Sequence, residues 1–233
     1  MKENSLFISL CLFLSFTLPA QRMIFKRDSV SFTPQEKQWG RNAPNILIPY
    51  VQFNWALGPK QDGAKLHLGH SFNFRLGLDY KRKITSWLNL GLKVQYATET
   101  FRLVQDSAKI LPDTILHESE WFNLQCLTIG GFFRFNLGLQ REGSYGIYLE
   151  TGVNYVWAIR FFHIYNEELT GGESEQVRIH NLTYTQPGYG EAYLKLGWRH
   201  FATISTFRFT PLFKSQSGYP DLPWAKLGFE LAF

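Results

Sequence analysis

Apolar and polar residues alternate along most of the chain, and the alternation is clearest in the last ten residues. Large apolar side chains occupy every second position there, namely Leu227, Phe229, Leu231 and Phe233. The positions between them hold Lys226, Gly228, Glu230 and Ala232. Because successive side chains of a strand point to opposite faces, this pattern predicts a terminal β-strand with one apolar face and one mixed polar face.

Eight segments alternate in this way, and each is long enough, or nearly so, to cross a bilayer as a tilted strand of roughly 9–11 residues. They are Ile46–Leu57, Leu66–Tyr80, Ser86–Val104, Glu120–Leu139, Tyr145–Phe161, Gly190–Trp198, Phe201–Phe213 and Ala225–Phe233. One face of each segment is dominated by Leu, Phe, Ile, Trp and Tyr, whereas the other carries Gly, Asn, Gln and charges of both signs. The pattern predicts an all-β fold, an eight-stranded antiparallel transmembrane β-barrel with up-and-down meander topology, whose apolar face meets lipid.

The connections between these segments alternate in length. Short turns are expected at residues 81–85, 140–144 and 199–200, and longer loops at 105–119, 163–187 and 214–222. Short periplasmic turns and long external loops are typical of bacterial barrels, and they place the start of the barrel on the periplasmic side. A soluble eight-stranded barrel of the lipocalin type is the structural alternative, but its exterior would carry more Lys and Glu.

The first 20 residues have the features of a secretory signal peptide. Lys2 precedes an apolar run from Leu6 to Leu18, and Leu18-Pro19-Ala20 offers a cleavage site. Residues 21–45 are then expected to form a periplasmic N-terminal segment, in which Thr33-Pro34-Gln35-Glu36 predicts the start of a short helix. Residues 46–233 form the predicted barrel.

Composition is consistent with apolar residues that are dispersed by alternation. Aromatic residues make up 17% of the chain, yet the mean hydropathy is −0.18. Of the 2 cysteines, Cys11 would leave with the signal peptide, so Cys126 can form no internal disulfide. The net charge of +5 is scattered along the chain, which does not indicate nucleic-acid binding.

Charged residues on the polar face are predicted to form a network in the barrel lumen. The network comprises Arg75, Asp79, Lys93, Glu99, Arg134, Glu150, Arg160, Glu191, Lys195, Arg208, Lys226 and Glu230. An eight-stranded barrel is just wide enough for side chains to fill, and buried charges persist when they are paired. We therefore expect a lumen filled by ion pairs. The alternative is a narrow pore that prefers anions, because basic residues are in excess.

Side chains that could support catalysis are present without a specific motif. His67 and Ser71 share the predicted lumen face, and Glu99 lies on the next segment. The remaining candidates are His70, His117, His163 and His180. No metal-ligand spacing and no phosphate-binding glycine loop is evident. The sequence therefore predicts no enzymatic activity, no catalytic residues, no cofactor and no metal site.

Taken together, the signal peptide, the eight segments and the terminal Phe233 resemble those of small bacterial outer-membrane barrels, such as the OmpA-like transmembrane domain and the PorT-like barrels of Bacteroidetes. The resemblance implies a location in the outer membrane. It also implies that Phe229, Leu231 and Phe233 form a signal for the barrel-assembly machinery. Asp28-Ser29-Val30, Asp106-Ser107-Ala108 and Asp113-Thr114-Ile115 resemble the triplets that Bacteroidetes O-glycosylate on exported proteins, although they are equally compatible with ordinary polar triplets in exposed segments.

These observations favour a non-enzymatic envelope protein, structural or accessory to envelope or secretion machinery. The expected partners are outer-membrane lipid, the barrel-assembly machinery and an envelope or secretion protein, but no nucleic acid. The alternative is a narrow pore or a lipid-modifying barrel enzyme. We expect the connection from His163 to Pro187 to be an external mobile loop. Its acidic first half could bind a divalent cation or a cationic partner, or could simply be solvated.

Overall fold

A computed structural model of the chain describes residues 43–57, 63–137, 146–168, 174–180 and 182–233. The predicted signal peptide and the Thr33-Pro34-Gln35-Glu36 segment lie outside the described residues. Within those residues, no helix has the length and apolar character needed to cross a membrane.

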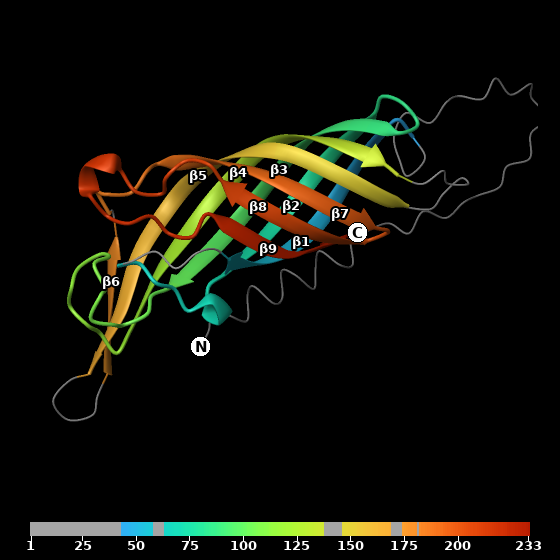
Figure 1. Ribbon diagram of the computed structural model, residues 1–233. Helices are drawn as coiled ribbons and strands as arrows, with labels where there is room; N and C mark the ends of the chain where they lie inside the picture. The colour runs from blue at the N-terminus through green and yellow to red at the C-terminus, as the bar shows by residue number, and fades with distance from the viewer. Residues whose placement is uncertain (1–42, 58–62, 138–145, 169–173, 181) are drawn as a thin grey trace, which may run out of the picture. The chain divides into compact units, whose positions relative to one another are not determined.

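Eight antiparallel strands close into a barrel (Figure 1), which confirms the predicted fold class. They are β1 (Asn45–Leu57), β2 (Phe72–Lys83), β3 (Leu88–Arg102), β4 (Ser119–Asn136), β5 (Ile147–Glu168), β7 (Gly188–Trp198), β8 (Phe201–Arg208) and β9 (Ala225–Ala232). Each strand pairs with the next one along the chain, and β9 pairs with β1 to complete the ring. The topology is therefore the predicted meander.

Long and short connections lie at opposite ends of the barrel. The end that carries the connections 58–71, 103–118, 169–187 and 209–224 is called the loop end here. The opposite end, called the turn end, carries residues 84–87, 137–146 and 199–200 and the C-terminal Phe233. The loop end includes two single-turn 3-10 helices, η1 (Leu68–His70) and η2 (Ser215–Ser217).

Two strands are shorter than the alternation predicts. Residues 66–71 form an isolated bridge at Leu66 and the η1 turn, so β2 begins only at Phe72. The second shortened strand, β8, ends at Arg208. Leu212 and Phe213, which follow it, are buried in the interior of the loop end. Leu66, Leu212 and Phe213 are thus buried in the barrel mouth instead of extending the wall, whereas Leu68 and His70 are exposed.

A β-bulge in β5 changes the face to which its later residues belong. Gln125 pairs with Arg160 and the adjacent Cys126 pairs with Ala158, so Ile159 is an extra residue. A one-residue slip exchanges inward and outward positions along the rest of a strand. Phe161 is consequently buried and Arg160 is exposed. The prediction that Arg160 belongs to the lumen network is wrong for this reason, as is the outward placement of Phe161.

The barrel interior has an apolar layer at the loop end above a charged layer. Strand residues such as Phe101, Phe122 and Leu124 pack there against residues from the connections, including Leu111 and Leu212. The connections also bind one another, because Ile110 and Leu111 donate backbone hydrogen bonds to the Gly63 carbonyl at 2.9 and 3.1 Å. The alternation predicts a polar lumen along the whole barrel, so this apolar layer differs from the expectation.

The expected mobile loop from His163 contains regular structure. The strand β6 (Ser174–His180) pairs antiparallel with the outer part of β5, from Phe162 to Glu168. β6 lies outside the closed ring, and most of its side chains are exposed. The acidic residues Glu167 and Glu175 face each other across this hairpin. The His163–Pro187 connection is thus in part a two-stranded extension of the barrel wall.

Candidate functional site

The charged layer consists of two groups of side chains, and the group nearer the turn end is centred on Glu150. This carboxylate accepts hydrogen bonds from Arg134 at 2.6 Å and from the Tyr193 hydroxyl at 2.9 Å, and it lies 2.7 Å from the Lys195 ammonium. Lys195 also bonds Glu230 at 2.8 Å. The other members of this group are Asp79 and Lys93, whose charged atoms lie 3.6 Å apart. All of these side chains are buried.

A second group lies between the first group and the apolar layer. The Arg75 guanidinium donates two hydrogen bonds to Glu191, at 2.5 and 3.0 Å, which is the bidentate geometry of strong ion pairs. The Glu99 carboxylate contacts the Lys226 ammonium at 2.5 Å and the Tyr189 hydroxyl at 2.9 Å. Strands that are not neighbours in the wall are therefore linked across the lumen.

These two groups together balance their charges. They contain five cations and five carboxylates, namely Arg75, Lys93, Arg134, Lys195 and Lys226 with Asp79, Glu99, Glu150, Glu191 and Glu230. Arg208, also predicted for the lumen, instead bonds Asp221 and the Leu222 carbonyl at the loop end, at 2.9 and 2.6 Å. Without Arg160 and Arg208, the basic excess that suggested an anion-preferring pore is absent from the two groups.

Aromatic rings in the lumen lie over glycines of the neighbouring strand. The direct cross-strand pairs are Tyr50 with Gly77, Phe132 with Gly91, and Tyr148 with Gly197. A Cβ atom added to Gly91 would lie 2.1 Å from the Phe132 ring, so only glycine leaves room for the aromatic side chain. These inward aromatic residues were not predicted from the sequence. The glycine that pairs with each of them could have indicated an aromatic side chain on the lumen face.

The candidate catalytic residues do not come together. Ser71 is buried and donates its hydroxyl hydrogen to the His67 carbonyl oxygen at 3.0 Å, whereas the His67 side chain is exposed. Glu99 is engaged by Lys226 and Arg75. His70, which precedes Ser71, and His180 of β6 are both exposed. No Ser–His hydrogen bond of the kind that activates a nucleophile occurs among the described residues.

A polar cluster at the loop end surrounds Glu120, the second residue of β4. Its carboxylate lies 2.6 Å from the His163 ring Nε2 and 2.5 Å from the Lys109 ammonium, and it accepts a hydrogen bond from Gln105 at 2.8 Å. The Glu120 side chain is buried, and these contacts satisfy both of its carboxylate oxygens.

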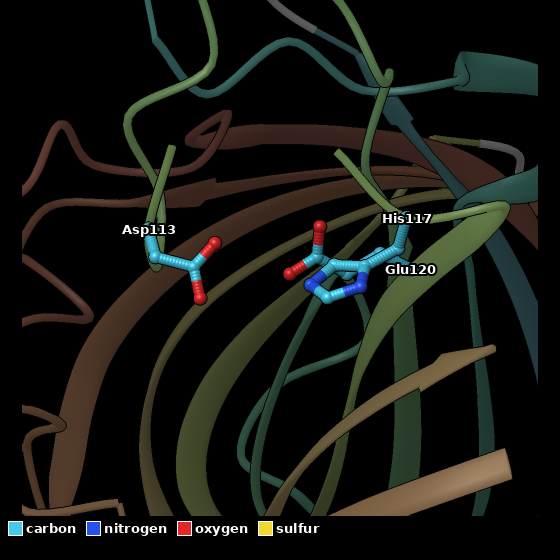
Figure 2. A group of neighbouring side chains, drawn as sticks. All are labelled: Asp113, His117 and Glu120. Atoms are coloured by element: carbon cyan, nitrogen blue, oxygen red, sulfur yellow. The ribbon is translucent and has the colours of Figure 1, made fainter. Parts of the chain in front are cut away.

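Asp113 and His117 belong to the same cluster, as Figure 2 shows. One ligand-type atom from each of Asp113, His117 and Glu120 lies within 4.8 Å of the others. Spacing in the sequence did not indicate this group, because two of its members come from a connection and the third from a strand. The Lys109 ammonium contacts Asp113 at 3.4 Å and the Ile115 carbonyl at 2.5 Å, so it holds the connection in place.

Two of the three Asp-Ser/Thr triplets form similar turns in this connection, whereas Asp28-Ser29-Val30 lies outside the described residues. The Asp106 and Asp113 carboxylates accept hydrogen bonds from the backbone N–H of Ala108 and Ile115, at 3.1 and 3.0 Å. Asp106 also accepts a hydrogen bond from the Lys65 ammonium at 2.8 Å, which holds the pKa of its carboxyl below the usual range. Their glycosylation stays a prediction.

Comparison with known proteins adds no relative to this picture. No protein-family model matches the chain, and no curated protein sequence matches it. The barrel fold is compatible with an outer-membrane protein, whereas the resemblance to OmpA-like and PorT-like barrels stays a prediction.

Proposed function

We propose that this protein is a non-enzymatic β-barrel of the bacterial outer membrane, with a structural or accessory role in the envelope. The observation that carries the proposal is the exposed apolar belt around a filled, charge-balanced lumen. Large apolar side chains are exposed on the outer face of every barrel strand, for example Leu92, Val153, Leu196 and Phe229. A soluble protein rarely exposes so large an apolar surface, whereas a membrane barrel needs one.

The loop end supplies the surface for an accessory role. It carries the β5–β6 hairpin, the long connections and the Glu120 cluster, whereas the connections at residues 84–87 and 199–200 of the turn end are short turns. By the topology expected for bacterial barrels, the loop end faces outside the cell. The resemblance to PorT-like barrels favours a partner in envelope or secretion machinery. Crosslinking in intact cells would distinguish an accessory protein, which has a constant partner, from a structural barrel.

The non-enzymatic part of the proposal is supported by the engagement of the reactive side chains. Glu99, Glu150 and Glu191 all form ion pairs with lysine or arginine side chains in the lumen. The Ser71 hydroxyl is hydrogen-bonded to backbone groups. Catalytic groups need a free position for substrate within hydrogen-bond reach. The lipid-modifying alternative is tested by lipid mass spectrometry of a deletion strain, which should match the parent strain.

The first prediction concerns conductance. The purified protein in a planar lipid bilayer should show no current steps, because ion pairs fill one part of the lumen and the apolar layer fills another. A porin added to the same bilayer is the positive control. Reproducible stepwise currents from the folded protein would instead favour the narrow-pore alternative.

The second prediction concerns topology. A glutamate-specific protease added to intact cells should cleave at the exposed residues Glu167 or Glu175 of the β5–β6 hairpin and leave the closed ring of strands uncut. The Glu175→Gln and Glu167→Gln variants should lose the corresponding cut, which identifies the site. Cleavage that requires permeabilisation of the outer membrane would place the loop end inside and contradict the proposed orientation.

A further inference from the structure

We propose that Asp113, His117 and Glu120 bind a divalent transition-metal ion of the zinc class at the loop end of the barrel. The first observation is the proximity of one potential ligand atom from each residue, all within 4.8 Å of one another. An imidazole with two carboxylates is a ligand set that zinc accepts, with a fourth position left for water. This inference does not depend on the proposed function.

The second observation is the state of the His117 ring. Only 4% of its side chain is exposed, and its Nε2 atom has no hydrogen-bond partner in the described part of the chain. Figure 2 shows the ring directed toward the Asp113 and Glu120 carboxylates. A buried polar atom without a partner is uncommon and indicates a missing ligand. An ion bound at Nε2 would supply that partner.

The His117 ring is also held in the orientation that a ligand requires. It stacks on Tyr165 with ring centroids 4.1 Å apart. Its other nitrogen, Nδ1, lies 3.5 Å from the Glu167 carboxylate. Metal-binding histidines commonly use one ring nitrogen for the metal and direct the other toward a carboxylate. The contacts of His117 therefore resemble those of a preoriented metal ligand.

The charges around the cluster favour a divalent cation despite the nearby lysine. The Asp113 and Glu120 carboxylates contact the Lys109 ammonium, whereas a third carboxylate, that of Glu167, lies beside His117. Lys109 contacts Oδ1 of Asp113 and Oε2 of Glu120, and the backbone N–H of Ile115 also uses Oδ1. The second Asp113 oxygen, Oδ2, thus stays available, and an added ion of charge +2 would offset the remaining negative charge.

The exposure of the three residues leaves an entry path. Glu120 is fully buried, whereas 44% of the Asp113 side chain is exposed. An ion could therefore approach from the Asp113 side and meet His117 and Glu120 behind it. Calcium and magnesium prefer sites made of oxygen ligands alone, so the imidazole favours zinc over these ions.

Zinc titration of the full chain, folded in detergent micelles, tests this proposal. Isothermal titration calorimetry with zinc chloride should show one site per chain, and calcium chloride should show no comparable site. His117→Gln should weaken zinc binding by more than the roughly 10–100-fold that follows when a metal ligand loses its hydrogen-bond partner. His67→Gln is the matched control, because it removes an exposed histidine at the same end and should leave zinc affinity unchanged.

A second variant covers the case in which His117→Gln does not fold. Asp113→Asn keeps the oxygen that accepts the Ile115 hydrogen bond but removes the ligand charge on a half-exposed side chain. This variant should fold, and its affinity for zinc should be at least tenfold lower than that of the parent protein. Absence of stoichiometric zinc binding to the folded parent protein, or equal affinity in the parent and these variants, would overturn the proposal.

Discussion

Glu150→Gln is expected to destabilise the folded barrel by about 3–5 kcal/mol, the cost of removing one partner from a buried ion pair. The Glu150 side chain is fully buried and contacts Arg134, Lys195 and the Tyr193 hydroxyl. Glutamine keeps the size of the side chain but removes its charge. Three lumen cations, those of Lys93, Arg134 and Lys195, would then share only Asp79 and Glu230.

Urea unfolding in lipid vesicles, followed by tryptophan fluorescence, measures this loss. Glu175→Gln is the control, because it makes the same chemical change on the exposed strand β6, where changes are usually within about 0.5 kcal/mol. If the two variants unfold at the same urea concentration, the lumen charges are not coupled as the structure implies.

Phe229→Lys is expected to cost about 2–4 kcal/mol, because in the proposed membrane barrel it places an ammonium group in lipid. Phe229 lies on the closing strand β9, opposite Phe53 of β1, and 57% of its surface is exposed. Its ring also packs edge-to-face on Trp55, with centroids 5.4 Å apart. Phe229→Leu shortens the side chain but keeps it apolar, so it separates the loss of this contact from the cost of the charge.

The same position distinguishes a membrane barrel from a soluble one. On a soluble barrel, lysine at an exposed site would face water and change stability by only about 0.5 kcal/mol. On a membrane barrel, Phe229→Lys should fold less completely into vesicles than Phe229→Leu, as measured by the fraction that migrates as folded protein on a gel without heating. Equal folding of the two variants would show that Phe229 does not contact lipid.

The strands and their faces were predictable because the signal has a period of two and recurs in every segment. Leu92 and Phe229 face outward, and Lys93 and Glu230 face inward, as the alternation predicts. The β5 bulge was not predictable, because it depends on how Gln125 and Cys126 meet the opposite strand. One extra residue, Ile159, was enough to place Arg160 on the outer face instead of the predicted lumen face.

The contents of the lumen were only partly predictable. Charged residues on inward positions indicated ion pairs, but the register and the curvature of the barrel decide which partners meet. Arg75 and Glu191, for example, come from β2 and β7, which are not adjacent in the wall. The apolar layer came from Leu111, Leu212 and similar residues in connections, where no periodicity marks a side chain as buried.

The separation in sequence of the lumen partners has a consequence for how the barrel folds. Arg75 and Glu191 are 116 residues apart, and Glu99 and Lys226 are 127 residues apart. Contacts between such distant residues form late and slow the folding rate. Until β9 joins β1 and closes the ring, Glu99 of β3 lacks Lys226 of β9. A partly assembled barrel therefore carries unmatched interior charges, which makes the open intermediate unstable and couples closure of the ring to a single cooperative step.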